Sequence, residues 1–421
     1  MRNFFLFLFL GISTISLSAC SDAREINQWT YVYSIGIDKG VTNNLRFSFQ
    51  TPSMKSQGGG SDESSGSGGG GQAGEKSYIV YSVDAPTFFA AVNMVESSSS
   101  RAYNYMHTKY LVISEELARE GVERFINSLI RSRQIRRIMH IIISKDGAGN
   151  FLEVFNPVVT AAISEAQEGF MDSNEESGLF IDTSYHQFFK DLKTTYKMPA
   201  APIVAINDSA NYLPTGTGIP PKDFKSEGDY YAGELPRKGG NPFEFFGTAL
   251  FERDKMVGML NGDETRGLLM ITSDLGRAFI SFPDPLDDAL RITISTKLKK
   301  DTEIKVETSG KNPKVHVKVS LEGDLLNVQS STQYESLEYK KKLEDAFSAY
   351  IREILIKTVD KCKGLGVDVF GFGEKAVMHF LTIQEWEEYD WLGRFKDAEI
   401  SVNVEFVIRR TGTLIKTNPI R

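Results

Sequence analysis

The first twenty residues of this chain are the feature that most limits what it can become. Arg2 is followed by an apolar segment over 4–17, and small residues lead from it to Cys20. A basic start, an apolar core and a small-residue cleavage site are typical of a secretory signal peptide. A cysteine directly after that site forms a lipobox, Leu17-Ser18-Ala19-Cys20. We therefore expect cleavage between Ala19 and Cys20, S-diacylglycerol on the Cys20 thiol and an acyl group on its new amino terminus.

Lipid anchoring would leave the folded part of the chain outside the bilayer. Each acyl chain contributes about 0.8 kcal/mol per buried CH₂, and two chains are enough for stable anchoring. The alternative is an uncleaved transmembrane helix, because about 20 apolar residues can cross a bilayer. Ser13, Ser16 and Ser18 weaken the segment as a permanent span, and no apolar stretch past residue 20 reaches membrane length. The sequence therefore favours a signal peptide over 1–19 and a lipid anchor.

Length and composition predict several folded domains. The 421 residues exceed what one hydrophobic core usually covers, and 41 % hydrophobic with 24 % charged residues are typical of globular proteins. A formal net charge of −7 argues against nucleic acid as a partner. With Cys20 bound to lipid, Cys362 has no partner for an intramolecular disulfide, so packing must supply the stability.

Strand and helix patterns alternate over 20–196, the expected N-terminal domain. Period-two or continuous apolar runs predict strands over 29–37, 45–49, 78–83, 110–113 and 138–143, the first two forming a hairpin. Helical spacing follows Pro86 and Ser114. Residues 56–76 are almost entirely Gly and Ser, which indicates a flexible insertion between two strands of one sheet. It is either a partner-binding loop or a tolerated surface insertion.

Prolines and glycines crowd the chain after residue 197, which predicts a domain boundary. We expect a small middle domain over 197–275 and a C-terminal domain over 276–421. Further elements are expected as strands over 203–206 and 402–408, a hairpin over 247–260, and helices over 263–271 and 343–359. The predicted fold class is α+β, in three domains with mixed or mainly antiparallel sheets covered by helices.

The sequence shows little sign of catalysis or of a cofactor. The five histidines lie far apart, with no pair at metal-ligand spacing, and no nucleophile elbow, Walker loop or His-Glu-x-x-His motif occurs. We therefore expect no catalytic residue, no metal and no cofactor, and conclude that the chain is not an enzyme.

Three groups of residues have both a functional and a structural interpretation. Gly371-Phe372-Gly373 is either a phosphate-binding turn or a tight turn that starts a helix. Carboxylates around Trp386 and Trp391 form either a sugar site or the outer face of a helix whose tryptophans pack inward; they are Glu385, Glu387, Glu388 and Asp390. A basic cluster is either an anion or lipid-headgroup site or a solvated helix end; it comprises Arg131, Arg133, Arg136 and Arg137. In each case the structural interpretation is favoured, and Cys362 is expected to be a small apolar core residue.

A set of motifs occurs in a fixed order along nearly the whole chain. After the lipobox come Arg24-Glu25-Ile26, Ile35-Gly36-Ile37-Asp38, Gly247-Thr248-Ala249-Leu250-Phe251, Asp254-Lys255-Met256-Val257-Gly258, Glu264-Thr265-Arg266-Gly267, Asp368-Val369-Phe370-Gly371-Phe372-Gly373-Glu374, the Trp386 and Trp391 pair, and Arg409-Arg410-Thr411-Gly412. The ordered set resembles the Ger(x)C family, the lipid-anchored C subunits of nutrient germinant receptors in endospore-forming bacteria. Two departures are Ser21-Asp22, where the family usually has Trp and Asp, and the long Gly/Ser insertion.

The resemblance implies a three-domain protein on the outer face of the spore inner membrane. Its implied partners are the membrane-spanning A and B subunits, which sense nutrients and pass ions, while the C subunit supports assembly and signalling. An alternative is an extracytoplasmic solute-binding lipoprotein of a transporter, which would need a cleft between two similar lobes. A third class, an extracytoplasmic hydrolase, lacks the catalytic groups it would need.

Overall fold

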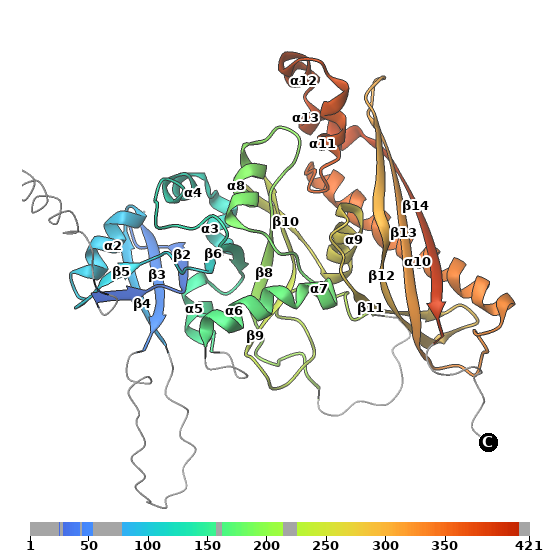
Figure 1. Ribbon diagram of the computed structural model, residues 1–421, viewed down its shortest axis with the longest axis horizontal. Coiled ribbons are helices and arrows are strands. Elements are labelled where there is room, and N and C mark those ends of the chain that lie inside the picture. Colours follow the sequence, from blue (N-terminus) through green and yellow to red (C-terminus); the bar gives the residue numbers. More distant parts are fainter. Residues whose placement is uncertain are drawn as a thin grey trace, which may run out of the picture.

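The computed structural model describes residue 25 and residues 28–42, 44–53, 78–156, 162–213 and 225–411. Cys20, the signal peptide expected over 1–19 and the insertion over 56–76 lie outside the described residues. Figure 1 shows an elongated arrangement, with the first strands at one end and the last strand at the other. Two sheets organise it, and we refer to the elements around them as the N-terminal unit and the C-terminal unit.

The N-terminal unit is built on an eight-stranded sheet of order β10-β9-β8-β7-β6-β2-β3-β4. Its elements are β1 (Trp29–Tyr31), β2 (Ser34–Lys39), β3 (Leu45–Pro52), β4 (Tyr78–Ala85), α2 (Phe88–Glu96), β5 (Ala102–Asn104), β6 (Tyr110–Ser114), α3 (Glu115–Glu120), α4 (Glu123–Leu129), β7 (His140–Ser144), α5 (Ala148–Val154), α6 (Ile163–Asp172), α7 (Asn174–Ser177), α8 (Tyr185–Lys193), β8 (Ala200–Ile206), β9 (Phe243–Glu252) and β10 (Lys255–Leu260). β2, β6, β7 and β8 are parallel, and antiparallel strands extend the sheet on both sides. β1 and β5 form a separate parallel pair.

Apolar residues cover both faces of this sheet, as the continuous apolar runs predict for central parallel strands. In β6, Leu111 and Ile113 belong to the core under α2, α3, α4 and α8, whereas Tyr110 and Val112 belong to the core under α5 and α6. β2 and β3 form the predicted hairpin. β3 also pairs with β4, so the two strands that flank the Gly/Ser insertion are neighbours in one sheet, as expected.

The strands expected for a separate middle domain over 197–275 belong to the same eight-stranded sheet. β8 pairs in parallel with β7, and β9 and β10 follow at its edge as the predicted hairpin. The boundary predicted near residue 197 rested on the prolines that follow it. Pro202 lies inside β8, where the register with β9 shifts, and proline is compatible with a strand at such a bulge. In terms of sheets, the described residues therefore form two units rather than three.

The C-terminal unit has a four-stranded sheet of order β11-β12-β13-β14, in which only the β13–β14 pair is parallel. Its elements are α9 (Gly262–Thr272), β11 (Ala278–Asp284), β12 (Asp287–Glu307), β13 (Lys314–Val328), α10 (Leu337–Leu365), α11 (Phe372–Ala376), η3 (Val377–His379), α12 (Ile383–Tyr389), α13 (Trp391–Arg394), η4 (Phe395–Asp397) and β14 (Glu399–Arg410).

One face of this sheet is covered and the other is exposed. The α10 side chains Leu343, Phe347 and Ile351 are fully buried in the core that lies against the sheet. On the outer face, charged side chains pair across the strands, as in Lys318–Glu405. The two mixed sheets with their helices confirm the predicted α+β class. No helix within the described residues is long and apolar enough to cross a bilayer.

Candidate functional site at the joint between the two units

The turn that follows α10 is organised by one buried carboxylate. Asp368 is completely buried, and its Oδ1 accepts backbone hydrogen bonds from Phe370, Gly371 and Phe372 at 3.0–3.3 Å. Its Oδ2 accepts the Gly373 N–H and the Trp391 Nε1–H, both at 2.9 Å. Burial raises the pKa of the Asp368 carboxyl, and these donated hydrogen bonds offset part of that rise. The turn and α13 are therefore held by a single side chain.

The same turn contacts the N-terminal unit. The carbonyl of Asp368 accepts the Met198 N–H at 2.8 Å, from the segment that leads into β8. An added Cβ at Gly373 would lie 2.2 Å from the Tyr196 carbonyl oxygen and 2.7 Å from the Trp391 ring. The absence of a side chain at Gly373 therefore allows the two units to approach closely at this turn.

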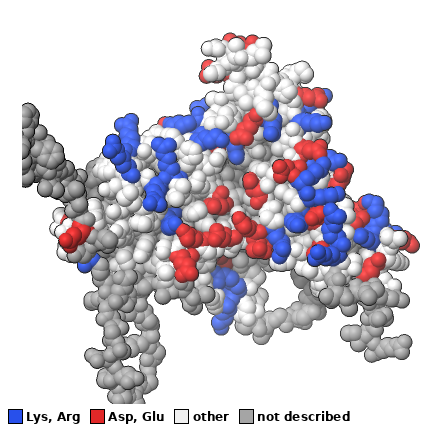
Figure 2. Space-filling view, in the orientation of Figure 1, with Lys and Arg blue, Asp and Glu red and all other residues white. Residues whose placement is uncertain are grey.

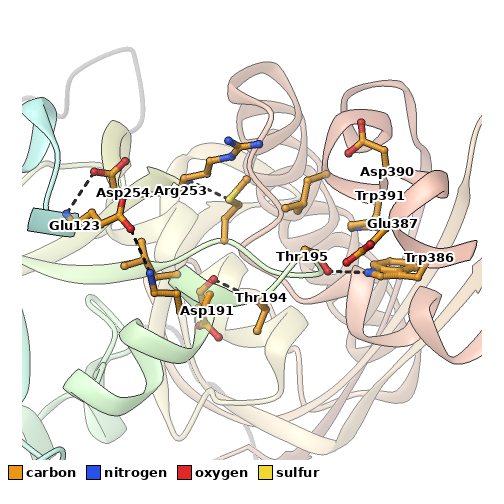
Figure 3. A pocket seen from close by; sticks show the side chains of 14 residues that line it. Glu123, Asp191, Thr194, Thr195, Arg253, Asp254, Trp386, Glu387, Asp390 and Trp391 are labelled. Atoms are coloured by element: carbon orange, nitrogen blue, oxygen red, sulfur yellow. Dashed lines mark hydrogen bonds and ion pairs between the residues drawn. The ribbon is translucent and has the colours of Figure 1, made fainter. Parts of the chain in front are cut away.

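The two tryptophans complete this contact. Trp386 of α12 donates its Nε1–H to Thr195 Oγ1 at 2.8 Å (Figure 3), and its ring stacks at 6.4 Å from that of Trp391. Both rings are buried, at 5 % and 1 % exposure. Because neither indole presents an open face, the structure agrees with the inward-packed tryptophans and not with a sugar platform.

Between the units lies a groove of about 460 Å³. Figure 3 shows that it is lined on one side by residues of α8, the following segment and the β9–β10 turn, and on the other by residues of α12 and α13. Its charged residues are largely engaged: Lys193 pairs with Glu123 at 3.3 Å, and Gln187 donates to Asp191 at 2.7 Å. Burial raises the pKa of the Asp191 carboxyl. The described residues contain no group of three or more His, Cys, Asp or Glu side chains arranged to hold a metal ion.

A second contact between the units is made by α9. Arg266 is 3 % exposed; its Nε donates to the Ser177 carbonyl at 3.1 Å, and its Nη1 pairs with Glu227 at 2.9 Å and with Asp263 at 3.5 Å. Burial raises the pKa of the Asp263 carboxyl, while the Ser226 hydroxyl and Arg266 lower it. Next to this cluster, Glu264 forms a 2.6 Å ion pair with Lys361 of α10. Arg266 thus joins α9 to the N-terminal unit, and Glu264 joins it to α10 of its own unit.

The other residues singled out in the sequence have structural roles here. Gly371 precedes α11, so the glycine-rich segment starts a helix as favoured, although 367–370 is not a strand. Cys362 is fully buried on α10, and burial raises the pKa of its thiol far above the usual range. The basic cluster, Arg131, Arg133, Arg136 and Arg137, is exposed between α4 and β7, in agreement with a solvated segment. Ala19 and Cys20 lie outside the described residues.

Sequence reasoning missed the N-terminal half of the joint. Thr195, Tyr196 and Met198 lie between α8 and β8 and contact the C-terminal unit through a hydroxyl, a carbonyl and an N–H. Contacts made by backbone groups cannot be recognised from residue types. The sequence offered one indication, the high density of Gly and Trp over 371–391, the segment that these residues contact.

We expect Gly373→Ala to destabilise the joint. The added methyl group must displace the Tyr196 carbonyl or the Trp391 ring, and such overpacking costs about 1–3 kcal/mol. Thermal unfolding of the chain lacking 1–19 measures the loss. The matched control is Gly364→Ala on α10, where nothing lies within 4 Å of the new Cβ, so stability should be unchanged or higher. Equal behaviour of the two variants would contradict the close approach.

Comparisons with known proteins cover both units of the chain. A model described as the spore germination protein N-terminal domain matches residues 22–206, and one described as spore germination B3/GerAC like, C-terminal, matches residues 246–412. The chain belongs to the Ger(x)C family of spore germination proteins. The resemblance drawn from the ordered motifs is thereby confirmed, and with it membership among the C subunits of germinant receptors.

Relatives of this Ger(x)C protein align along nearly their whole length. It is 25 % identical to YfkR of Bacillus subtilis (strain 168) over 411 residues, which cover 96 % of this chain and 95 % of YfkR. It is 22 % identical to spore germination protein KC of the same organism, with 100 % and 98 % covered, and 18 % identical to spore germination protein GerQC of Bacillus cereus, with 98 % and 99 % covered. The solved structure of the GerBC protein aligns with a TM-score of 0.49 at 16 % identity, covering 89 % of this chain and 96 % of that one.

Proposed function

We propose that this Ger(x)C protein is a non-catalytic receptor subunit, anchored by lipid at Cys20 on the outer face of the spore inner membrane. There it would assemble with the membrane-spanning A and B subunits and support germination signalling. The observation that carries the proposal is where the family motifs lie. The Asp368 carbonyl, the Gly373 backbone and the Arg266 side chain all take part in contacts between the two units, and the side chains of Asp368 and Arg266 are buried.

The anchor accounts for how modest interfaces could hold the complex together. Trp29, the first residue of β1, is nine positions after Cys20, and an extended chain spans at most about 3.6 Å per residue. The start of β1 would thus be kept within roughly 32 Å of the bilayer. Confinement of this kind raises the effective concentration of the partners without any new contact. A net charge of −7 gives no general attraction to anionic lipid, so the tether would be needed.

The groups with shifted pKa values favour a non-catalytic role. Asp368 and Cys362 are buried in packed surroundings, and their shifts come mainly from burial. A catalytic group needs a pKa near the working pH and access to a substrate. The two units also differ in sheet size and topology, whereas a solute-binding protein needs two similar lobes.

We expect Cys20→Ala to release the protein from the membrane and to abolish the response of spores to their nutrient. Loss of the thiol prevents attachment of the lipid, and no helix within the described residues is long and apolar enough to cross a bilayer. The control is Cys362→Ala, which removes the other cysteine from a buried position and should leave the chain in the membrane fraction. Membrane fractionation after a high-salt wash and nutrient-triggered germination are the measurements. Retention of Cys20→Ala in the washed membranes after its segment over 1–19 has been shown by mass spectrometry to be absent would contradict the proposed anchor.

A further inference from the structure

An exposed apolar tip lies at the far end of the C-terminal unit, next to α12. Met378, Leu381 and Ile383 are 69 %, 95 % and 71 % exposed, although they fall within six residues of one another. Figure 2 shows this end, at the top of the view, as mostly uncharged surface with some acidic atoms. Large apolar side chains exposed together usually mark a site of interaction. We call these three residues the α12 tip.

The backbone that carries the tip is fixed by packing and hydrogen bonds. The Phe380 ring packs 5.4 Å from Trp386 and 4.9 Å from Tyr389, on the same helix that is bonded to Thr195. Thr382 Oγ1 accepts the Glu385 N–H at 3.2 Å, and the Leu381 N–H donates to Glu385 Oε2 at 3.1 Å. A partner that binds the tip would therefore not have to order it, which saves conformational entropy.

The charges beside the tip indicate what kind of surface it fits. Four exposed carboxylates follow it, those of Glu385, Glu387, Glu388 and Asp390, and none of them forms an ion pair with a described residue. The nearby Arg394 guanidinium instead lies 4.7 Å from the centre of the Tyr389 ring. Unneutralised carboxylates beside an apolar surface disfavour an anionic bilayer and favour a protein that offers Lys or Arg.

We propose that the α12 tip is a protein-docking site, which takes a segment of another protein with an apolar hollow bordered by Lys or Arg. Leu381 and Ile383 would enter the hollow, and Glu387 and Glu388 would face the basic border. The inference goes beyond the proposed function, because it rests on exposure and charge and does not require the lipid anchor.

Photocrosslinking in spores tests the site in the full-length chain. Benzoylphenylalanine replaces Leu381 or, as the matched control, Leu337, which is 88 % exposed at the start of α10. We expect Leu381 to give a protein adduct at least about tenfold above the control, with the captured peptide carrying Lys or Arg beside apolar residues. Adducts with lipid alone, or a yield no higher than at Leu337, would overturn the inference.

Charge reversal distinguishes specific docking from nonspecific hydrophobic binding. Glu387→Lys combined with Glu388→Lys should lower the adduct yield about tenfold and leave the thermal unfolding temperature unchanged, since both side chains are exposed. An unchanged yield would contradict the basic border. If the captured protein is not a membrane-spanning receptor subunit, the docking site stands, and the partners in the proposed function are tested separately by co-purification.

Discussion

Asp368→Ala should lower the free energy of unfolding by more than about 3 kcal/mol. The substitution leaves four backbone N–H groups and the Trp391 indole N–H without an acceptor in a buried place, and each unsatisfied buried group costs about 1–3 kcal/mol. Because the same turn accepts the Met198 N–H, we expect the contact between the units to loosen as well. Urea unfolding of the chain lacking 1–19, followed by circular dichroism, measures the loss.

Two further variants show that the hydrogen bonds, and not the volume of the side chain, cause this effect. Asp368→Asn keeps the volume but places an amide NH₂ where one oxygen accepts two or more donors, so we expect a loss close to that of the alanine variant. Asp360→Ala removes an exposed aspartate from α10 and should change stability by less than about 0.5 kcal/mol. A tolerated Asp368→Asn would show that the carboxylate is not the organising group.

Arg266→Met should cost about 3–5 kcal/mol, the range found when one partner of a buried ion pair is removed. Methionine fills a similar space but leaves Asp263, which is 8 % exposed, beside Glu227 without its cation. The Ser177 carbonyl also loses the Nε–H donor that joins α9 to the N-terminal unit. The matched control is Arg277→Met, because Arg277 is exposed and pairs only loosely with Glu176 at 3.8 Å. It should change stability by less than about 1 kcal/mol.

The deficit of Arg266→Met should also depend on pH. Burial already raises the pKa of Asp263, and removing Arg266 removes a group that lowers it. A carboxyl whose pKa is raised in the folded state destabilises that state fully at pH values above its folded pKa and not at all below its unfolded pKa. The difference between variant and native chain should therefore be larger at about pH 8 than at about pH 5. A deficit that is constant or grows on acidification would contradict the buried ion cluster.

The elements with strong apolar patterns could be predicted from the sequence, because the spacing of the apolar residues fits either a strand or a helix but not both. The alternation over 45–49 gave β3, and the helical stripe of Leu343, Phe347 and Ile351 gave α10. The Gly/Ser insertion was placed between two strands of one sheet, and β3 and β4 are indeed paired. The spacing of apolar residues within one segment shows which face of a helix or strand is buried, so these elements can be predicted from local sequence.

The predictions that were wrong or missing concern features set by contacts between segments far apart in the chain. A single helix was expected after Ser114, but it divides into α3 and α4 at Gly121, whose φ of +128° ends the first helix. An added Cβ there would lie 2.6 Å from Asp254 Oδ2, so the break reflects the approach of the β9–β10 turn. The same limit hid Thr195 and Met198, whose partners in the joint lie more than 150 residues away.

Co-purification from spore membranes tests the central claim most directly. The full-length chain is tagged at its carboxyl end, extracted in mild detergent and recovered in parallel with its Cys20→Ala variant. We expect two membrane-spanning receptor subunits to be recovered with the native chain, and neither with the variant. Recovery of the native chain from the membranes without any membrane-spanning partner would contradict the proposed role as an anchored subunit of a germinant receptor.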